Sequence, residues 1–98
     1  MTSAEPRWHP EAVQDALATR DWYAERSPLA ARGFLLAIEE AVDSVTADPH
    51  RWPEVGYGCR RYVLPGRYPY SLVYRTAPAL EVVAVAHDRR EPRFWKER

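Results

Sequence analysis

Apolar residues in the first half of the chain recur at the spacing of α-helices, in two consecutive stretches. The first stretch begins at Pro10, because proline suits the first turn of a helix, where its missing N–H costs nothing. The second begins at Ser27-Pro28, a capping serine followed by proline, and ends at Asp48-Pro49, where the residue before proline leaves the helical region. Only a residue or two separates the stretches, so we expect an antiparallel helical hairpin. The second stretch carries an apolar stripe at helical spacing: Phe34, Leu35, Ile38, Ala41, Val42 and Val45.

The second half changes to a pattern of short strands. Three runs rich in β-branched and aromatic residues, 59–64, 68–76 and 80–87, are separated by Pro65-Gly66 and by residues 77–79. Turns this short favour an antiparallel meander. The run 80–87 is apolar on both faces after its first residues, so we expect it to be the most buried strand.

The remaining segments complete the predicted fold. Arg7-Trp8-His9 is a candidate short first strand, and residues 51–58, rich in Pro, Gly and aromatics, are expected to form a loop. A helical hairpin cannot bury its apolar stripes alone and needs another layer. The sequence therefore predicts an α+β fold, an N-terminal antiparallel helical hairpin packed on a small antiparallel β-sheet, followed by a short C-terminal tail.

Length and composition indicate one domain, spanning residues 1–98. With 46% hydrophobic residues the chain is too apolar to be disordered, and it has no apolar run of the roughly 20 residues that a membrane span needs. Residues 1–6 lack the basic and apolar pattern of a secretory signal. A single cysteine, Cys59, excludes an internal disulfide or a four-cysteine zinc site. We therefore expect a soluble, cytoplasmic protein that contacts no membrane and carries no metal or small-molecule cofactor.

The formal net charge of zero conceals a division along the chain. Residues 1–54 hold five Arg and ten acidic residues, whereas residues 55–98 hold eight Arg, one Lys and four acidic residues. Thirteen of the fourteen cations are Arg, the side chain best suited to bidentate contact with carboxylates and phosphates. The strand half and the tail are therefore the expected basic surface, although paired faces that neutralise each other would give the same totals.

Histidine and cysteine offer few candidates for catalysis. His87 ends the third strand run and could act as a general base, but a strand-end histidine bonded to the backbone or to Asp88 is the more frequent arrangement. His9 and His50 lie beside prolines and are expected to be cap or loop residues. Cys59 is expected to be a small, partly buried residue and not a nucleophile.

Five segments between about Trp8 and Arg98 form a recognisable combination: Trp22-Tyr23, the loop 48–53, Arg60-Arg61, the run 68–75 and the segment 87–98. The last of them follows the pattern His-x-x-Arg-x-Pro-x-aromatic-Trp-x-x-Arg. Together these segments resemble the RelE/ParE toxin superfamily, and the final pattern is similar to the end motif of its ParE-type members. The resemblance implies a single toxin domain of a bacterial type II toxin–antitoxin pair, which arrests growth and is neutralised by a cognate antitoxin.

The superfamily has two main activities: RelE-like members cleave mRNA on the ribosome, and ParE-like members poison DNA gyrase. Cleavage by the 2′-hydroxyl requires a base, a cation and an acid. Here the only lysine is Lys96, Ser71 stands where the nuclease branch tends to have Arg, and Trp95, which does not titrate, occupies the terminal acid–base position. We therefore favour a non-enzymatic, ParE-like gyrase inhibitor. The alternatives are a non-toxic homologue that only binds antitoxin, or a ribonuclease with the catalytic residues Arg60, Arg61, His87 and Arg89.

Arginine and aromatic residues are the predicted contact groups. Arg is enriched at interfaces, and Trp and Tyr are frequent at their energetic centres. Trp22 and Tyr23 are predicted to be an exposed pair that contacts the antitoxin, and Trp95 is expected to fold back onto the sheet or the helices. The predicted target-binding set is Arg60, Arg61, Arg67, Arg75, Arg89, Arg90, Arg93 and Trp95.

Overall fold

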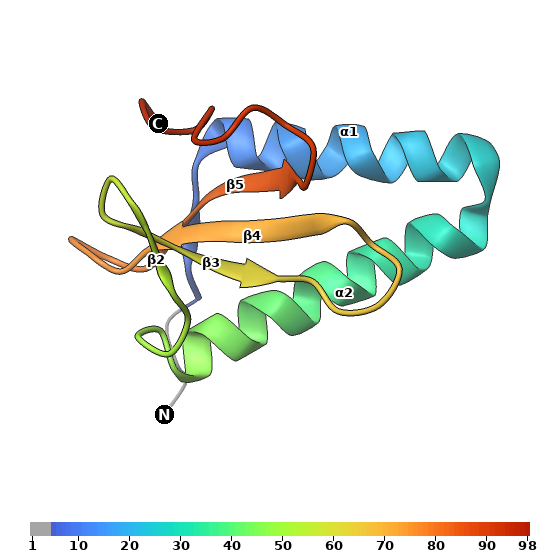
Figure 1. Ribbon diagram of the computed structural model, residues 1–98. Helices are drawn as coiled ribbons and strands as arrows, with labels where there is room; N and C mark the ends of the chain where they lie inside the picture. The colour runs from blue at the N-terminus through green and yellow to red at the C-terminus, as the bar shows by residue number, and fades with distance from the viewer. Residues whose placement is uncertain (1–4) are drawn as a thin grey trace.

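A helical hairpin packs on one face of a five-stranded sheet in this protein, whose computed structural model describes residues 5–98 (Figure 1). The α+β fold is as predicted, with the helices N-terminal to most of the sheet. The expectation about a secretory signal concerns residues 1–6 and lies mostly outside the described range. In the described range, neither helix is long and apolar enough to cross a membrane. The elements are β1 (Arg7–Trp8), α1 (Pro10–Arg26), α2 (Pro28–Ala47), β2 (Glu54–Gly56), β3 (Cys59–Val63), β4 (Tyr70–Arg75) and β5 (Glu81–His87).

Side-chain caps set the ends of the hairpin. The Nδ1 atom of His9 accepts a hydrogen bond from the Glu11 N–H at 3.1 Å, which confirms the expected cap role of this histidine. Ser27 serves both helices: its N–H donates to the Tyr23 carbonyl at 2.7 Å, and its hydroxyl accepts from the Ala30 N–H at 3.2 Å. One residue therefore closes α1 and opens α2, which produces the tight reversal.

The predicted meander forms the centre of the sheet, whose strand order is β1-β5-β4-β3-β2. Two expectations need correction. Residues 54–56, predicted as loop, form β2 and pair antiparallel with β3. The first strand pairs parallel with β5, through Arg7↔Glu81 and Trp8↔Val82, so the sheet is mixed and not purely antiparallel. The partner of β1 is distant in the sequence, and the pairing of β2 with β3 contains an irregularity in register. Both β1 and β2 are too short for the alternation of polar and apolar residues to predict a strand.

The sheet buries both of its faces. On the inner face, Leu72, Tyr74 and Val82 pack against the hairpin residues Phe34 and Ala41, and all five are fully buried. The outer face carries a second cluster beneath the C-terminal tail, made of Cys59, Val73, Val83, Ala84 and Trp95. The central residues of β5 are buried, as predicted, and those of β4 are buried to the same degree. The tail thus supplies a third layer that continues the core.

Candidate functional site

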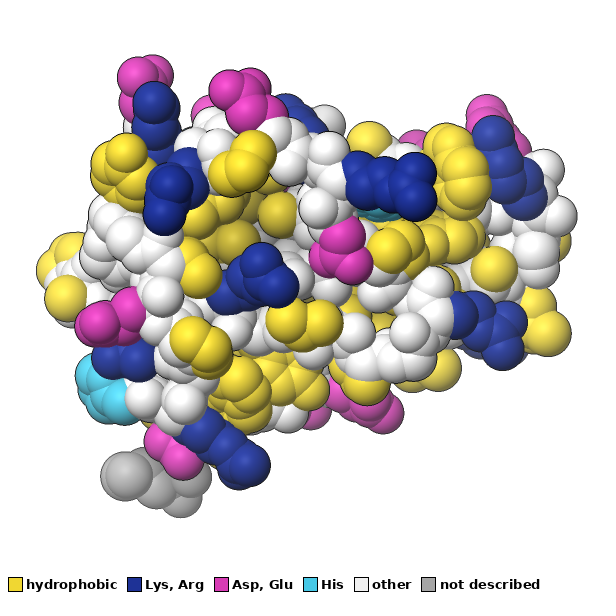
Figure 2. Space-filling model, in the orientation of Figure 1, with side chains coloured by type: hydrophobic (Ala, Val, Ile, Leu, Met, Phe, Trp, Pro, Cys, Tyr) yellow, Lys and Arg dark blue, Asp and Glu magenta, His cyan; other side chains and the backbone are white. Residues whose placement is uncertain are grey.

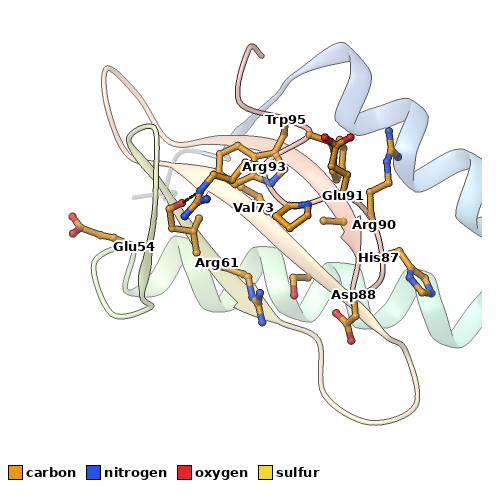
Figure 3. Close-up of a pocket in the computed structure, with 14 residues that line it drawn as sticks. Glu54, Arg61, Val73, His87, Asp88, Arg90, Glu91, Arg93 and Trp95 are labelled. Carbon is orange, nitrogen blue, oxygen red and sulfur yellow. Dashed lines mark hydrogen bonds between the residues drawn. The ribbon is translucent and has the colours of Figure 1, made fainter.

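A cavity of about 370 Å³ lies on the outer face of the sheet, between the strands and the C-terminal tail (Figure 3). Its floor includes Ser71 and Val73 from β4 and Ala86 from β5, with Arg61 of β3 at one side and the tail at the other. Ser71 and Ala86 are register partners. Because both side chains are small, the sheet surface is hollow at this point, and we call this space the outer cavity.

The charged groups around the outer cavity differ in how far they are already engaged. The Arg93 Nε donates to the Val55 carbonyl at 3.3 Å, and the Arg90 guanidinium stacks on the Phe94 ring at 3.8 Å from its centre. Arg61 is exposed, and within residues 5–98 it forms no ion pair and donates no side-chain hydrogen bond. Basic and acidic side chains alternate around apolar surface on this side of the molecule (Figure 2). The acidic residues that line the cavity are Glu54, Asp88 and Glu91.

Ser71 is the unusual group on the floor. It is 2% exposed, and its Oγ atom is buried without a hydrogen-bond partner among the described residues. Buried hydroxyl groups are nearly always hydrogen-bonded, because an unmade bond costs about 1–3 kcal/mol. The outer cavity therefore contains a buried hydroxyl that the protein itself leaves without a partner.

Two of the predicted target-binding arginines have other roles. Arg60 donates to the Trp52 carbonyl at 2.7 Å and to the His50 carbonyl at 3.2 Å, so it holds the loop before β2. Arg75 forms an ion pair with Glu81 at 3.0 Å and donates to the Arg98 carbonyl at 2.8 Å. Neither lines the outer cavity. The structure brings together Arg61, Arg90 and Arg93, and it leaves the exposed Arg67 and Arg89 outside the cavity.

Trp95 is buried, with 5% of its surface exposed, inside the outer-face cluster. The expectation that it folds back onto the sheet is confirmed. Its inclusion among the target contacts stays a prediction, but an indole that packs with Cys59, Val73 and Val83 offers little surface to a partner. Its role is to hold the tail against the sheet, and so to shape one wall of the outer cavity.

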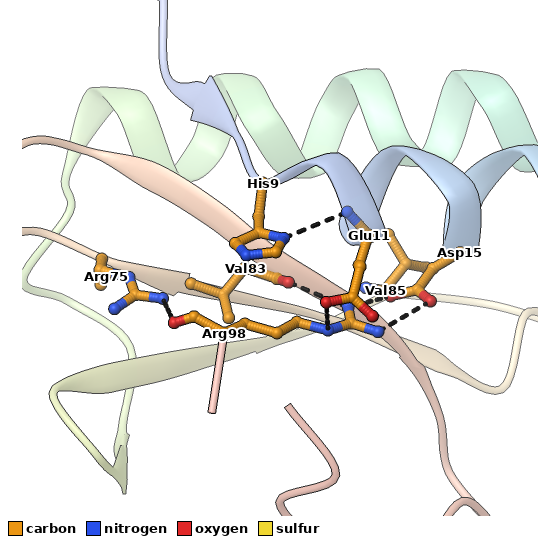
Figure 4. Close-up of polar contacts among 7 residues, drawn as sticks. All are labelled: His9, Glu11, Asp15, Arg75, Val83, Val85 and Arg98. Atoms are coloured by element: carbon orange, nitrogen blue, oxygen red, sulfur yellow. Dashed lines mark hydrogen bonds and ion pairs between the residues drawn. The ribbon is translucent and has the colours of Figure 1, made fainter. Parts of the chain in front are cut away.

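An ion pair that sequence reasoning missed fastens the end of the chain to α1 (Figure 4). The Arg98 Nη1 lies 2.6 Å from Asp15 Oδ2 and donates to the Val83 carbonyl at 3.1 Å, while the Val85 N–H donates to Asp15 at 3.1 Å. The pairing of β1 with β5 ends at Val82, so the Val83 carbonyl and the Val85 N–H lie beyond it. The side chains of Arg98 and Asp15 provide the hydrogen-bond partners of these two backbone groups. We call this arrangement the Asp15–Arg98 latch. Arg98 belongs to the end motif, but nothing in the sequence marked Asp15 as its partner.

The candidates for proton transfer or nucleophilic attack have structural roles. The Nδ1 atom of His87 accepts from the Arg89 N–H at 3.0 Å, and its ring meets Tyr70 edge-on at 4.8 Å, which confirms the backbone-bonded role. Cys59 is buried, and this burial raises the pKa of its thiol above the ordinary 9.0. In the described part of the chain, no group of three or more His, Cys, Asp or Glu side chains could hold a metal ion.

A second cavity, of about 390 Å³, lies between α1 and the ends of β4 and β5, and we call it the aromatic slot. Trp22 is 49% exposed beside it, with the Arg26 guanidinium 3.7 Å above its ring. Tyr23 is half-buried and meets Tyr68 edge-on at 5.3 Å. The prediction of an exposed pair therefore holds for Trp22 but not for Tyr23. The slot is lined by Ala18, Thr19, Trp22, Tyr23, Pro69, Tyr70 and His87.

Comparison with known protein families matches residues 7–92 of this chain to the ParE toxin of the type II toxin–antitoxin system, parDE. The matched range covers both helices, all five strands and most of the residues around the outer cavity. A search among curated proteins found no match to the chain. The family match agrees with the likeness already carried by the end motif and the hairpin.

Proposed function

We propose that this chain, which belongs to the ParE toxin family of type II toxin–antitoxin systems, inhibits DNA gyrase through the outer face of its sheet. The observation that carries the proposal is the outer cavity, which is lined both by Arg61, a side chain without a partner in the described chain, and by Ser71, whose buried hydroxyl is unpaired. An arginine side chain does not serve as a general base, and serine without an adjacent base is a weak nucleophile. These groups are suited to binding a partner and not to bond cleavage.

The surface around the cavity extends the same argument. Arg67 and Arg89 are exposed outside the cavity, and Arg90 and Arg93 project from the tail that forms its wall. Exposed cations of this kind steer association with an acidic partner at low ionic strength. We call Arg61, Arg67, Arg89, Arg90 and Arg93 the basic face. In this proposal Arg60, Arg75 and Trp95 act indirectly, by holding the loop and the tail in place.

Neutralisation by a cognate antitoxin is the second part of the proposal. Trp22 exposes half of its surface beside the aromatic slot, and large aromatic side chains of this kind are frequent energetic centres of interfaces. We expect the antitoxin to cover Trp22. Trp22→Ala should weaken antitoxin binding by about 10- to 30-fold, corresponding to roughly 1.4–2 kcal/mol. Val13→Ala, on another exposed apolar residue of α1 that lies outside the slot and is 37% exposed, is the control for titration calorimetry.

The test of the target is a supercoiling assay with purified gyrase. The toxin should inhibit supercoiling, and the double variant Arg61→Gln with Arg90→Gln should raise the inhibitory concentration at least about tenfold, because it removes two charges from the proposed contact. Arg32→Gln removes an exposed charge from α2, on the other side of the molecule, and should leave inhibition unchanged. Unchanged supercoiling in excess toxin would refute gyrase as the target.

One observation favours the ribonuclease alternative. His87 is among the residues that line the outer cavity with Arg61 and Arg90, although its ring meets Tyr70 edge-on beside the aromatic slot. The discriminating experiment is mRNA cleavage in a translating extract, with His87→Gln as the variant. Cleavage that disappears in this variant would replace the gyrase proposal. Induced expression without a growth defect would instead indicate a homologue that retains only antitoxin binding.

A further inference from the structure

We infer that the outer cavity is a carboxylate subsite, which receives a single Asp or Glu side chain of a protein partner. Arg61 is its counterion and the Ser71 hydroxyl its hydrogen-bond donor. The inference rests on the proposed function in taking the partner to be a protein, and it names the chemical group that this partner must present.

The Ser71 hydroxyl is a hydrogen-bond donor that the protein leaves unused. Ser71 is 2% exposed and lines the outer cavity. Its Oγ atom has no hydrogen-bond partner among the described residues. A free hydroxyl in such a place is an available donor, and a bond to an ionised acceptor is about twice as strong as one to a neutral group. An incoming carboxylate oxygen would therefore remove the cost of leaving Ser71 unpaired.

Arg61 lies on the same face of the sheet as Ser71. Its register partner on β4 is Val73, and Ser71 lies two residues further along the same strand, so both side chains belong to one face of the sheet. Most cations nearby are already engaged, whereas Arg61 is not: Arg93 bonds to Val55 and Arg90 stacks on Phe94. Arg61 and Ser71 therefore line the same hollow from the same face of the sheet.

The charges around the cavity favour a single carboxylate over a nucleic acid backbone. Glu54, Asp88 and Glu91 stand around the cavity, and Figure 3 shows these three carboxylates at different edges of it. A phosphate chain crossing this space would meet these carboxylates, and it would need several cations in line. One acidic side chain needs a single counterion, and the apolar floor of Val73 and Ala86 can pack against its methylene groups.

The inference is tested by NMR titration of the intact protein with N-acetyl-glutamate amide, which carries one side-chain carboxylate and no other charge. The expected result is saturable shifts at the amides of Ser71 and Ala86 and at the Arg61 Nε. N-acetyl-glutamine amide, the neutral isostere, should bind at least about tenfold more weakly, because the charge-assisted bonds are lost. Shifts that do not saturate, or equal shifts with the two compounds, overturn the subsite.

Three variants assign the binding to the named groups. Arg61→Gln should weaken binding of N-acetyl-glutamate amide at least about tenfold, and Ser71→Ala about fivefold or more. Arg32→Gln should leave it within about twofold. Ser71→Ala should keep or raise the melting temperature, because it removes an unpaired buried hydroxyl. A fall in melting temperature would show that Ser71 has a structural partner, and that result would also overturn the inference.

Two further arms separate the possible ligands and the two proposals. Inorganic phosphate and a short single-stranded oligonucleotide should bind more weakly than N-acetyl-glutamate amide, and tighter binding of the oligonucleotide at Ser71 and Arg61 overturns the choice of a protein partner. Carboxylate binding without gyrase inhibition would refute gyrase as the target and leave the subsite standing. Gyrase inhibition without carboxylate binding would refute only the subsite.

Discussion

Removing one side of the Asp15–Arg98 latch should destabilise the whole fold, although it changes a residue at the end of the sequence. We take Arg98→Met as the perturbation, because methionine keeps much of the aliphatic stem and removes the charge. The side chains of Arg98 and Asp15 are 9% and 12% exposed, so the pair is largely shielded from water. In the variant the Asp15 carboxylate stays buried without its counterion, and the Val83 carbonyl loses the guanidinium donor.

The magnitude follows from this burial. Breaking a buried ion pair by removing one partner typically costs about 3–5 kcal/mol, most of it from the charge left behind. Asp15 keeps one hydrogen bond, from the Val85 N–H at 3.1 Å, so we expect the lower end, about 3 kcal/mol. For a domain of about 100 residues, that corresponds to a fall in melting temperature of about 12–24 °C.

Urea denaturation followed by circular dichroism measures this loss, and Glu11→Gln provides the matched control. Glu11 lies 4.0 Å from the same guanidinium, but its side chain is 66% exposed, so solvent screens the pair. The control should change the free energy of unfolding by less than about 0.5 kcal/mol. Arg98→Met with Asp15→Leu should recover part of the loss, because no buried charge is then left alone.

The outcome that would refute this reasoning is a loss below about 1 kcal/mol in Arg98→Met, or an equal loss in Glu11→Gln. The latch also predicts a local effect, since it holds the tail whose Trp95 closes the outer-face cluster. Hydrogen exchange at the Trp95 indole should accelerate in Arg98→Met under conditions where the sheet amides remain protected. If both accelerate together, the tail has no opening of its own.

Experiments at three further places test the packing of the core. Gly33→Ala should destabilise the protein by about 1–2 kcal/mol despite the better helix propensity of alanine, because its Cβ would collide with the Tyr68 hydroxyl, and Tyr68→Phe should relieve the loss in denaturation experiments. Burial raises the pKa of the Tyr74 phenol above 10.0, so the unfolded chain loses this proton first, and the free energy of unfolding should fall as pH rises past 10.0. This slope should weaken in Tyr74→Phe, which itself should cost about 1 kcal/mol by leaving the Pro49 carbonyl unpaired. The Cys59 thiol, 2% exposed, should react with a disulfide reagent at least about 100-fold more slowly in the native protein than in urea, and comparable rates would contradict its burial.

Local sequence was enough to predict the helices and the central strands. The helix ends are set by local effects: the fixed backbone of proline at Pro10, Pro28 and Pro49, and the capping hydroxyl of Ser27. The hairpin could therefore be predicted from neighbouring residues alone. The three central strands carry several residues each and are joined by turns. β1 and β2 have too few residues for alternation to mark them, and their partners lie elsewhere in the chain.

The candidate site divides in the same way. The charge pattern located the basic half of the chain, and the end motif indicated a toxin of the RelE/ParE type. The sequence did not show which arginines remain available to bind a partner, because this depends on residues that are distant in the chain. Arg60 donates to loop carbonyls and Arg98 pairs with Asp15, whereas Arg61 has no such contact in the described residues. Trp95 is buried for a similar reason, since the tail folds onto an outer face that only the assembled sheet creates.

Charge and hydrophobicity belong to each residue and can be counted along the chain, so composition, helix ends and the −5 and +5 halves were available from the sequence. Availability for binding is a property of pairs of residues brought together by folding. The unpaired Ser71 hydroxyl results from three strands meeting below a tail that leaves the hollow open, and no spacing within β4 could show it. The fold therefore leaves Arg61 unpaired at this hollow, which is where we propose that a carboxylate of the partner binds.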